Sequence, residues 1–158
     1  MDIWHLIPST NPGGNEVFAK SLIENFPVKS NHTVFSSSNI NGQIANDLNI
    51  IAQLKKLNIE KSFKNIFYII RLFLNQKPHA IIIHTFNTSL LHFIVISKIF
   101  NIRKVIIKVG NPPQKKYLLK IRTFLFILRF LNIPLVFCSN YALSEFKKFF
   151  KLPKNSLS

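Results

Sequence analysis

The stretch that decides the fold is DIWHLIPSTNPGGNEVFAKSL, residues 2–22. It begins with a short apolar run, passes through small and polar residues to the adjacent pair Gly13 and Gly14, and ends with apolar residues at helical spacing. This order predicts a strand over residues 2–7, a corner at the glycines and a helix over residues 15–25.

The glycine pair at the corner has two interpretations. Glycine permits positive φ values and the close approach of another group to the backbone. The first turn of a helix offers unpaired N–H groups and the positive end of a dipole to a phosphate. Gly13 and Gly14 can therefore form an anion cradle, or they can form a tight turn in which Asn15 caps the helix. The glycine spacings of dinucleotide-binding and P-loop motifs are both absent.

The rest of the chain repeats the alternation of strand and helix. Several strand candidates are apolar at consecutive positions, which is typical of strands buried on both faces of a parallel sheet. The alternation predicts one α/β domain, a single Rossmann-like, doubly wound parallel sheet flanked by helices, with five strands and the first strand central. The later strands are expected at residues 32–36, 79–84, 104–109 and 134–138, the later helices at 50–75 (broken near Asn58), 88–100, 113–131 and 141–150, and a loop rich in Ser and Asn at 36–49.

The predicted strands end in small and polar residues. In a doubly wound sheet, ligands bind beyond the carboxyl ends of the strands, so the segments that follow the strands are candidates for a site. Short turns between strand and helix favour the same residue types without any ligand. These segments are residues 8–14, 36–38, 84–88, 110–113 and Ser139.

The chain of 158 residues carries a formal net charge of +15, which calls for an anionic partner or another explanation. Lysine supplies most of the positive charge, and Asn, Ile and Phe are abundant, as AT-rich codon usage produces. Nucleic-acid surfaces depend more on arginine for bidentate contacts, and an RNA platform would interleave exposed aromatic and basic residues. Nucleic acid is therefore not expected as a partner.

Cysteine use and the N-terminus favour a reducing, cytoplasmic location. The single cysteine, Cys138, excludes an intramolecular disulfide and a multi-cysteine metal site, and its apolar neighbours predict a buried side chain. The N-terminus lacks a basic segment with a cleavage site. The longest charge-poor stretch, residues 78–97, contains polar residues such as His84 and His92, which disfavour a membrane span. Peripheral association with the inner face of the membrane is compatible with this location.

Three segments, in this order, resemble one known family. They are the opening stretch, then KPHAIIIHTFNTSLLHFI over residues 77–94, then PLVFCSNYALSEFKK over residues 134–148. They are similar to the N-terminal half of a GT-B fold glycosyltransferase of the family 4 kind. In that family the pieces are a strand, Gly-Gly corner and helix, then a strand that ends near a histidine, then a strand that ends in serine before a helix. The resemblance covers nearly the whole chain.

The resemblance implies two Rossmann-like domains that face each other across a cleft. The N-terminal domain would hold the acceptor, and the C-terminal domain would hold the nucleotide-sugar donor through a Glu-x7-Glu motif. This chain matches only the first: residues 1–150 would form that domain, and residues 151–158 a tail truncated before any second domain. The implied activity is sugar transfer, with retention, to a glycan or lipid-linked acceptor. The chain alone is not expected to perform it, and no cofactor is expected.

The resemblance also assigns residues to a site. Gly13 and Gly14 would approach the donor phosphates across the cleft, and the loop with Gly110 and Asn111 would face the acceptor. Many members of the family carry a histidine at that strand end, where this chain has Gly110 and Asn111. No catalytic residue is therefore named.

His84 and Lys108 are further acceptor-side candidates, each with a structural alternative. His84 can contact a ligand or transfer a proton, or it can bond a neighbouring backbone group. Lys108 can meet an acceptor phosphate or carboxylate, or it can extend into solvent. His5 is expected to be structural and Ser139 to cap the last helix. The histidines lack the spacing of a metal site, so no metal is predicted.

The segment QKKYLLKIRTFLFILRFL, residues 114–131, is strongly apolar and carries a basic stripe. Lys115, Arg122 and Arg129 fall seven residues apart on one side of the expected helix. Such a helix can lie on an anionic membrane surface, or it can cover the sheet with a solvated basic edge. The alternative function for the chain is therefore a non-catalytic basic module that binds an anionic membrane surface.

Overall fold

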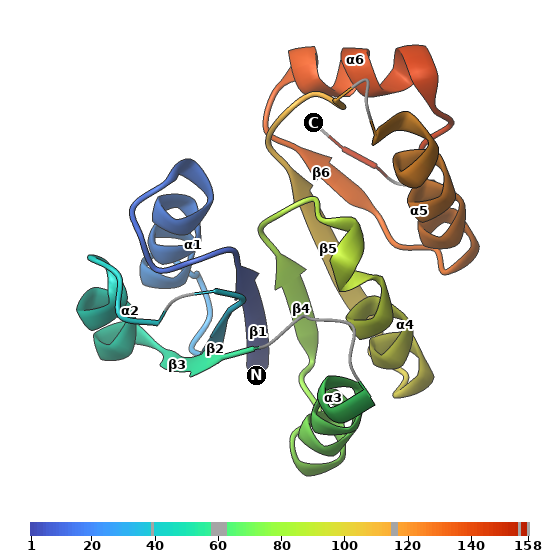
Figure 1. Ribbon diagram of the computed structural model, residues 1–158. Helices are drawn as coiled ribbons and strands as arrows, with labels where there is room; N and C mark the ends of the chain where they lie inside the picture. The colour runs from blue at the N-terminus through green and yellow to red at the C-terminus, as the bar shows by residue number, and fades with distance from the viewer. Residues whose placement is uncertain (39, 58–62, 115–116, 155, 158) are drawn as a thin grey trace.

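The computed structural model describes residues 1–38, 40–57, 63–114, 117–154 and 156–157, which form one six-stranded parallel sheet with flanking helices (Figure 1). The strand order is β3-β2-β1-β4-β5-β6. The strands are β1 (Asp2–Ile7), β2 (Asn31–Ser36), β3 (Gln53–Lys56), β4 (Ala80–Ile83), β5 (Lys104–Val109) and β6 (Leu135–Phe137). The helices are α1 (Gly14–Glu24), α2 (Ala45–Ile51), α3 (Phe63–Asn75), the short 3-10 turn η1 (Thr88–Leu90), α4 (Leu91–Ile99), α5 (Leu118–Phe130) and α6 (Asn140–Phe149).

The topology confirms the predicted fold class and the central position of β1. From β1 the chain moves outward through β2 to β3, and α3 then returns it to β4 on the other side of β1. Because crossovers between parallel strands are right-handed, this reversal places α1 and α2 on one face of the sheet and α3, α4 and α5 on the other (Figure 1). The carboxyl ends of β1 and β4 form the switch point at which such sheets bind ligands.

The segment between residues 36 and 75 is where the prediction was wrong. The predicted helix over residues 50–75 consists of the end of α2, the strand β3 and then α3, and the predicted loop over residues 36–49 contains the start of α2. β3 has the sequence QLKK and lies at the edge of the sheet, where lysine side chains can reach solvent from an extended strand. Its polar residues lack the apolar pattern from which a strand is predicted. The predicted break near Asn58 falls outside the described residues.

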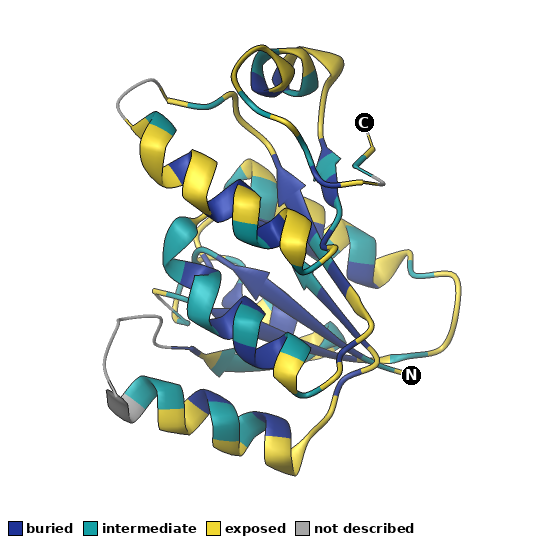
Figure 2. Ribbon diagram, turned by 90° about the vertical axis from the view of Figure 1, so that its right-hand side faces the viewer, coloured by how far each residue is buried: buried dark blue, intermediate teal, exposed yellow. Residues whose placement is uncertain are grey.

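Apolar side chains pack on both faces of the sheet, but unequally. The strands other than the edge strand β3 are mostly buried, and each helix has an exposed outer side (Figure 2). The larger cluster joins the sheet to α3, α4, α5 and α6 and includes Trp4, Phe73 and Phe93. The smaller cluster lies under α1 and α2, and its buried members are Ile7, Ala19, Ile23, Val34 and Leu48.

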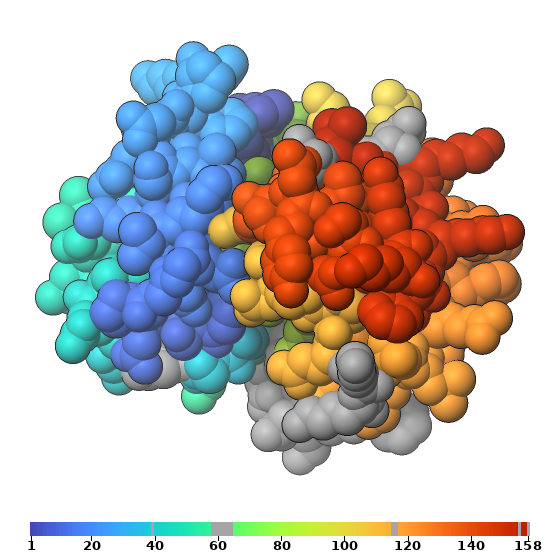
Figure 3. Space-filling view, turned by 90° about the horizontal axis from the view of Figure 1, so that it is seen from above, coloured from blue at the N-terminus to red at the C-terminus, as the bar shows by residue number. Residues whose placement is uncertain are grey.

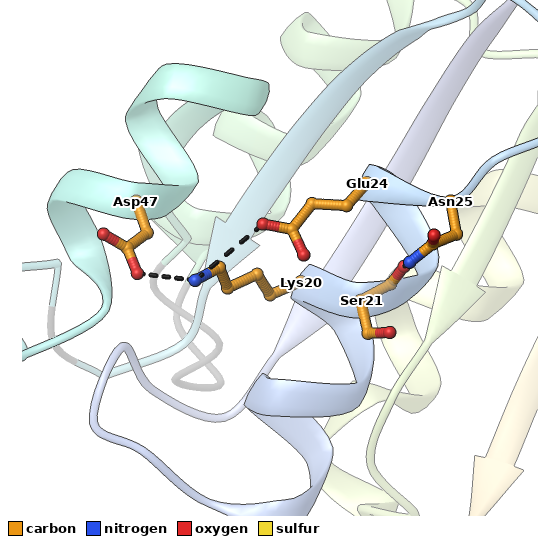
Figure 4. Close-up of polar contacts among 5 residues, drawn as sticks. All are labelled: Lys20, Ser21, Glu24, Asn25 and Asp47. Atoms are coloured by element: carbon orange, nitrogen blue, oxygen red, sulfur yellow. Dashed lines mark hydrogen bonds and ion pairs between the residues drawn. The ribbon is translucent and has the colours of Figure 1, made fainter.

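Lys20 connects α1 to α2 at the surface (Figure 4). Its ammonium donates to Asp47 Oδ2 at 2.6 Å and lies 3.8 Å from Glu24 Oε1, one turn further along α1. The hydrogen bond to Asp47 raises the pKa of Lys20 above its ordinary value. At the end of the same helix, Asn25 Nδ2 donates to the carbonyl of Ser21 at 2.8 Å. Exposed ion pairs contribute little stability, so these contacts mainly fix how α2 lies against α1.

The C-terminal region confirms one prediction and corrects another. Ser139 caps α6, because its Oγ accepts from the backbone N–H of Ala142 at 3.1 Å. Cys138 is exposed, so the predicted buried side chain is wrong; it follows β6 instead of lying within it. Beyond α6, Leu157 forms a parallel bridge with Val136, which places the described part of the tail along the outer edge of β6.

Candidate functional site

A groove of about 380 Å³ opens at the carboxyl edge of the sheet, within the range of small-molecule sites. In the view from above (Figure 3), the blue N-terminal region and the orange-to-red C-terminal region lie side by side across this edge. Three strand exits line the groove: Asn15 in the first turn of α1, residues 85–88 after β4 and residues 110–114 after β5. Side chains of α6 and of the start of α5 complete the lining, namely Tyr117, Lys120, Ile121 and Phe146.

Local hydrogen bonds explain the shape of the β4 exit. The side chain of Asn87 accepts from the backbone N–H of Ser89 at 2.9 Å and from its hydroxyl at 2.8 Å, which fixes the start of η1. Gly110 and Asn111 lie on the facing loop. A Cβ atom at Gly110 would lie 3.7 Å from Asn15 Oδ1, which is an ordinary contact. The backbone does not require glycine there, and the acceptor-side role of this loop stays a prediction.

The glycine corner is filled by a side chain of the protein itself. Gly13 is the N-cap of α1 and has no side chain with which to cap it, so the alternative in which Asn15 caps the helix is wrong. The carboxylate of Glu16 folds back on the corner, where its Oε1 accepts from Ser9 Oγ at 3.2 Å. A Cβ atom at Gly13 would lie 2.6 Å from Glu16 Oε2. Gly13 therefore makes room for a carboxylate at the helix start, where the dipole favours negative charge.

Gly14 is under no such constraint. Its φ is not positive, and a Cβ atom there would meet no heavy atom within 4 Å. The positive φ that glycine permits is therefore not used at Gly14. The space in front of Gly14 is open to a ligand, but a phosphate there would share the corner with the Glu16 carboxylate.

Lys108 is buried near the end of β5 with 9% of its surface exposed, so the alternative of a solvated strand-end lysine is wrong. Its Nζ donates to Asn15 Oδ1 at 3.4 Å and lies 3.9 Å from the centroid of the Phe18 ring, a cation–π contact. Within the described part of the chain, Lys108 forms no ion pair with a carboxylate. Buried lysines are usually paired with a carboxylate. Because Lys108 has no such partner in that part of the chain, its ammonium still has N–H groups with which to bind a ligand oxygen.

Three histidines form a hydrogen-bonded row on the face of the sheet that α1 covers. His5 Nε2 lies 2.9 Å from His32 Nδ1, and His5 Nδ1 lies 3.1 Å from His84 Nε2. At the far end, His32 Nε2 lies 2.7 Å from Ser30 Oγ, and this hydroxyl donates to the carbonyl of Val28 at 3.0 Å. His84 thus bonds another side chain, so the alternative in which it bonds a backbone group is wrong. The expectation of a structural His5 is consistent with its place inside the row.

Burial keeps the row neutral. It lowers the pKa of His5 to about 2, and the neighbouring histidines add to this effect. Burial, followed by the charge of Lys108, lowers the pKa of His84 to about 3, and burial also lowers the pKa of His32. At neutral pH each ring therefore carries one N–H donor and one bare acceptor nitrogen.

The structure brings some of the predicted residues together and separates others. Ile83 pairs with Ile107, so the next residues along, His84 and Lys108, are neighbours on adjacent strands. Arg122 and Arg129 are exposed on α5, away from α1. Lys115 lies outside the described residues. Of the other candidates, Gly110 and Asn111 line the groove, and Gly13 and Gly14 form the corner next to Asn15. His84 and Lys108 are buried under α1.

Sequence reasoning did not identify Glu16, Phe18 or the partners of His84. Glu16 is the third residue of its helix, a position from which carboxylates fold back on the helix start, and that signal was available. The histidine row depends on strand register, which sets His5 and His32 on one face. Register cannot be derived from the positions of histidines in single strands.

A larger cavity of about 740 Å³ lies at the opposite, amino-terminal edge of the sheet, beside Ser30, His32 and Pro78. Helix N-termini, which attract anionic and polar ligands, follow the carboxyl ends of the strands and not their amino ends. We therefore place the candidate site at the smaller groove.

Among the residues that the structure describes, no three His, Cys, Asp or Glu side chains are arranged to hold a metal ion. None of the described helices combines the length and apolar character needed to cross a bilayer. A scan against models of protein families found no matching family, and a search of curated proteins found no significant match.

Proposed function

We propose that this chain is the acceptor-side domain of a GT-B fold glycosyltransferase that resembles family 4. It would transfer a sugar from a nucleotide-sugar to a glycan or lipid-linked acceptor only together with a donor-binding domain. One observation carries the proposal: the three segments that resemble the family each contribute to the same groove. Asn15 comes from the first segment, residues 85–88 from the second and Phe146 from the third.

The chemistry of the groove suits recognition of a sugar. Its polar side chains are mostly neutral amides and hydroxyls, which can both donate to and accept from sugar hydroxyls. Phe86, Tyr117 and Phe146 add aromatic surface. None of the described residues that line the groove is a carboxylate that could act as a general base. Stabilisation of the negative charge on the departing nucleotide is assigned to the second domain.

Amide NMR tests the acceptor side of the proposal. The ¹⁵N-labelled chain is titrated with a panel of methyl glycosides, and shifted amides are mapped. Shifts over residues 85–88 and at Gly110 and Asn111 would support the proposal. Shifts confined to the amino-terminal edge, as at Asn31 and Gln53, or no shift with any glycoside, would contradict it. Gly110→Leu, which fills the groove, should abolish the response, whereas Thr123→Leu on the exposed side of α5 should preserve it.

A separate observation favours the second candidate, a surface that binds an anionic membrane. Phe126 is 67% exposed and Phe130 is 83% exposed, and both lie on α5 among its exposed arginines. Hollows between α5 and the segment after α6 extend this surface, and none of the described residues that line them is acidic. Exposed apolar groups interleaved with cations fit the boundary between headgroups and acyl chains. The surface comprises Leu119, Arg122, Phe126, Arg129, Phe130, Phe149, Lys151 and Lys154.

Vesicle pelleting tests this surface with a matched pair of double variants. Each basic residue near an anionic membrane contributes about 1 kcal/mol, so Arg122→Gln with Arg129→Gln should reduce partitioning into anionic vesicles roughly thirtyfold. Arg71→Gln with Arg103→Gln removes two exposed arginines elsewhere and should bind like the wild type. High salt should imitate the first pair, because exposed charges are screened. Equal binding by both pairs would remove the membrane from the account.

A further inference from the structure

The histidine row ends at an atom that has no hydrogen-bond partner. Nδ1 of His84 is buried and bonded to nothing among the described residues, and the side chain as a whole is fully buried. Buried polar atoms are nearly always paired, because an unpaired one has lost its hydrogen bonds to water without replacement. His84 therefore holds an unused hydrogen-bonding group next to the candidate site.

The row determines whether this atom is a donor or an acceptor. The hydroxyl of Ser30 has one proton, which it donates to the Val28 carbonyl, so it must accept from His32 Nε2–H. His32 Nδ1 is then an acceptor and takes the proton of His5 Nε2–H. His5 Nδ1 in turn accepts from His84 Nε2–H. Each neutral ring has only one N–H, so Nδ1 of His84 is a bare acceptor.

A donor with unused capacity lies beside this acceptor. Ile82 of β4 pairs with Ile106 of β5, so His84 and Lys108, two residues further along each strand, lie side by side. Because side chains alternate between the two faces of a sheet, both point to the same face. Its ammonium has three protons and a single hydrogen bond, to Asn15, among the described residues. A ligand group that satisfies both atoms must donate to His84 and accept from Lys108.

We propose that His84 Nδ1 and Lys108 Nζ form a binding subsite for one hydroxyl group of the acceptor, covered in this structure by the Phe18 ring. A hydroxyl has one proton to donate and lone pairs to accept. A phosphomonoester dianion or a carboxylate has no proton and would face the lone pair of Nδ1. The inference rests on the proposed function only for the statement that the hydroxyl belongs to a sugar.

Phe18 is placed to open and close this subsite. Its ring centroid lies 6.0 Å from that of His84 and 3.9 Å from Lys108 Nζ, so the ring contacts both groups. Phe18 itself is 47% exposed on α1, which leaves its side chain room to turn outward into solvent. Exposed side chains change rotamer on the picosecond to nanosecond timescale, so the cover is no kinetic barrier to binding.

The first test measures the tautomer without any substitution. In a long-range ¹H–¹⁵N spectrum of the full chain at neutral pH, His5, His32 and His84 should each show a protonated Nε2 and an unprotonated Nδ1. His79, which is largely exposed and whose Nδ1 accepts from the backbone N–H of Asp2 at 3.0 Å, serves as the reference for a surface ring with an acceptor Nδ1. A protonated Nδ1 at His84 would overturn the proposal, because the subsite would then have two donors and no acceptor.

The second test adds the probes methyl glycosides and glycerol to the same sample. The Nδ1 resonance of His84 should move toward the hydrogen-bonded range, and Lys108→Met should weaken this response roughly tenfold, as loss of a hydrogen bond to a charged group predicts. Lys104→Met, an exposed position on the same strand, is the matched control. Phe18→Ala should strengthen the response several-fold, whereas Val17→Ala, equally exposed on α1, should not.

The outcomes separate this inference from the proposed function. A response of His84 to glycosides supports both. A response to glycerol alone supports the hydroxyl subsite and contradicts a sugar acceptor. Glycoside-induced amide shifts in the groove without any change at the His84 ring, in the wild type and in Phe18→Ala, would overturn the subsite and leave the proposed function standing.

Discussion

The two faces of β1 differ in chemistry although they belong to the same six residues. Trp4 and Leu6 face α3 and α4 and belong to the large apolar cluster. His5, between them in the sequence, faces α1 and joins the hydrogen-bonded row. We call these the apolar face and the polar face. Along β1 a change of one position in register would exchange them.

The apolar face contributes most of the stability, whereas the polar face carries the groups that can recognise a ligand. The apolar face carries the large aromatic cluster, in which Phe73 contacts Trp4, Phe93 and Phe100. The polar face holds His5, His32, His84 and Lys108 beneath one helix and a small apolar cluster. Buried polar groups contribute little net stability but are costly to leave unpaired. Such groups are retained where they serve a ligand or specify one structure.

The largest effect is expected on the apolar face. Phe73→Ala removes a fully buried ring from the centre of the aromatic cluster and should lower the free energy of unfolding by about 3–5 kcal/mol. Phe67→Ala on the same helix removes a ring that is mostly exposed and should change it by less than about 0.5 kcal/mol. Urea denaturation measures both. Similar losses for the two variants would mean that the cluster is not the stabilising core.

The polar face predicts sensitivity to acid. Unfolded histidines bind a proton near pH 6.5, whereas folded His5 and His84 have pKa values of about 2 and about 3. The unfolded chain thus binds more protons as the pH falls, and the free energy of unfolding should decrease below about pH 6.5 by roughly 2–3 kcal/mol per pH unit for the two together.

Urea midpoints over this pH range check the acid prediction. His84→Gln removes one of the two groups with the most strongly lowered pKa values and should roughly halve the slope, while Thr123→Gln at the surface, which removes no titrating group, should leave it unchanged. A free energy of unfolding that stays constant down to about pH 4 would contradict neutral buried histidines.

A smaller loss of stability is expected at the start of α6, which packs against the apolar face. Ser139→Ala removes the hydrogen bond to the backbone N–H of Ala142 and should cost about 1 kcal/mol of stability. Ser144→Ala, an exposed position in the same helix, should be nearly neutral. If the two variants are equally stable, Ser139 does not cap α6 in solution.

The smallest effects are expected at the glycine corner of the polar face, and their signs should differ. Gly14→Ala should stabilise the chain by roughly 0.5–1 kcal/mol, because it replaces an unstrained helical glycine. Gly13→Ala should destabilise it slightly, because alanine is a poorer N-cap residue than glycine and the new Cβ atom would displace the flexible end of the Glu16 side chain. Thermal unfolding distinguishes them. A stabilising Gly13→Ala would contradict the role of Gly13 as the N-cap of α1.

The sequence predicted those parts of the fold that repeat a local pattern. The strands that became β1, β2, β4, β5 and β6 are apolar runs bounded by turn residues, and their alternation with helices defines the fold class. β3 was not predicted, because an edge strand does not need an apolar pattern. The cap at Ser139 was predictable because capping is local, whereas the burial of Cys138 was not, since it depends on where β6 ends.

The candidate site was predictable in its place but not in its contacts. The rule that ligands bind at the carboxyl edge selected Gly110 and Asn111, which do line the groove. The connection of His84 to His5 and His32, and of Lys108 to Phe18, spans strands and a helix far apart in the sequence. Those contacts follow from sheet order and register, which a single sequence does not specify.

Sugar transfer measured with and without a donor domain tests the central claim most directly. The purified chain is incubated with labelled nucleotide-sugars and a membrane extract as acceptor source, alone and with a family 4 donor domain supplied as a second chain. The account predicts no incorporation by the chain alone and incorporation by the mixture, lost when Gly110→Leu fills the groove. Incorporation by the chain alone, or incorporation by the mixture that is unaffected by Gly110→Leu, would contradict an acceptor-side domain.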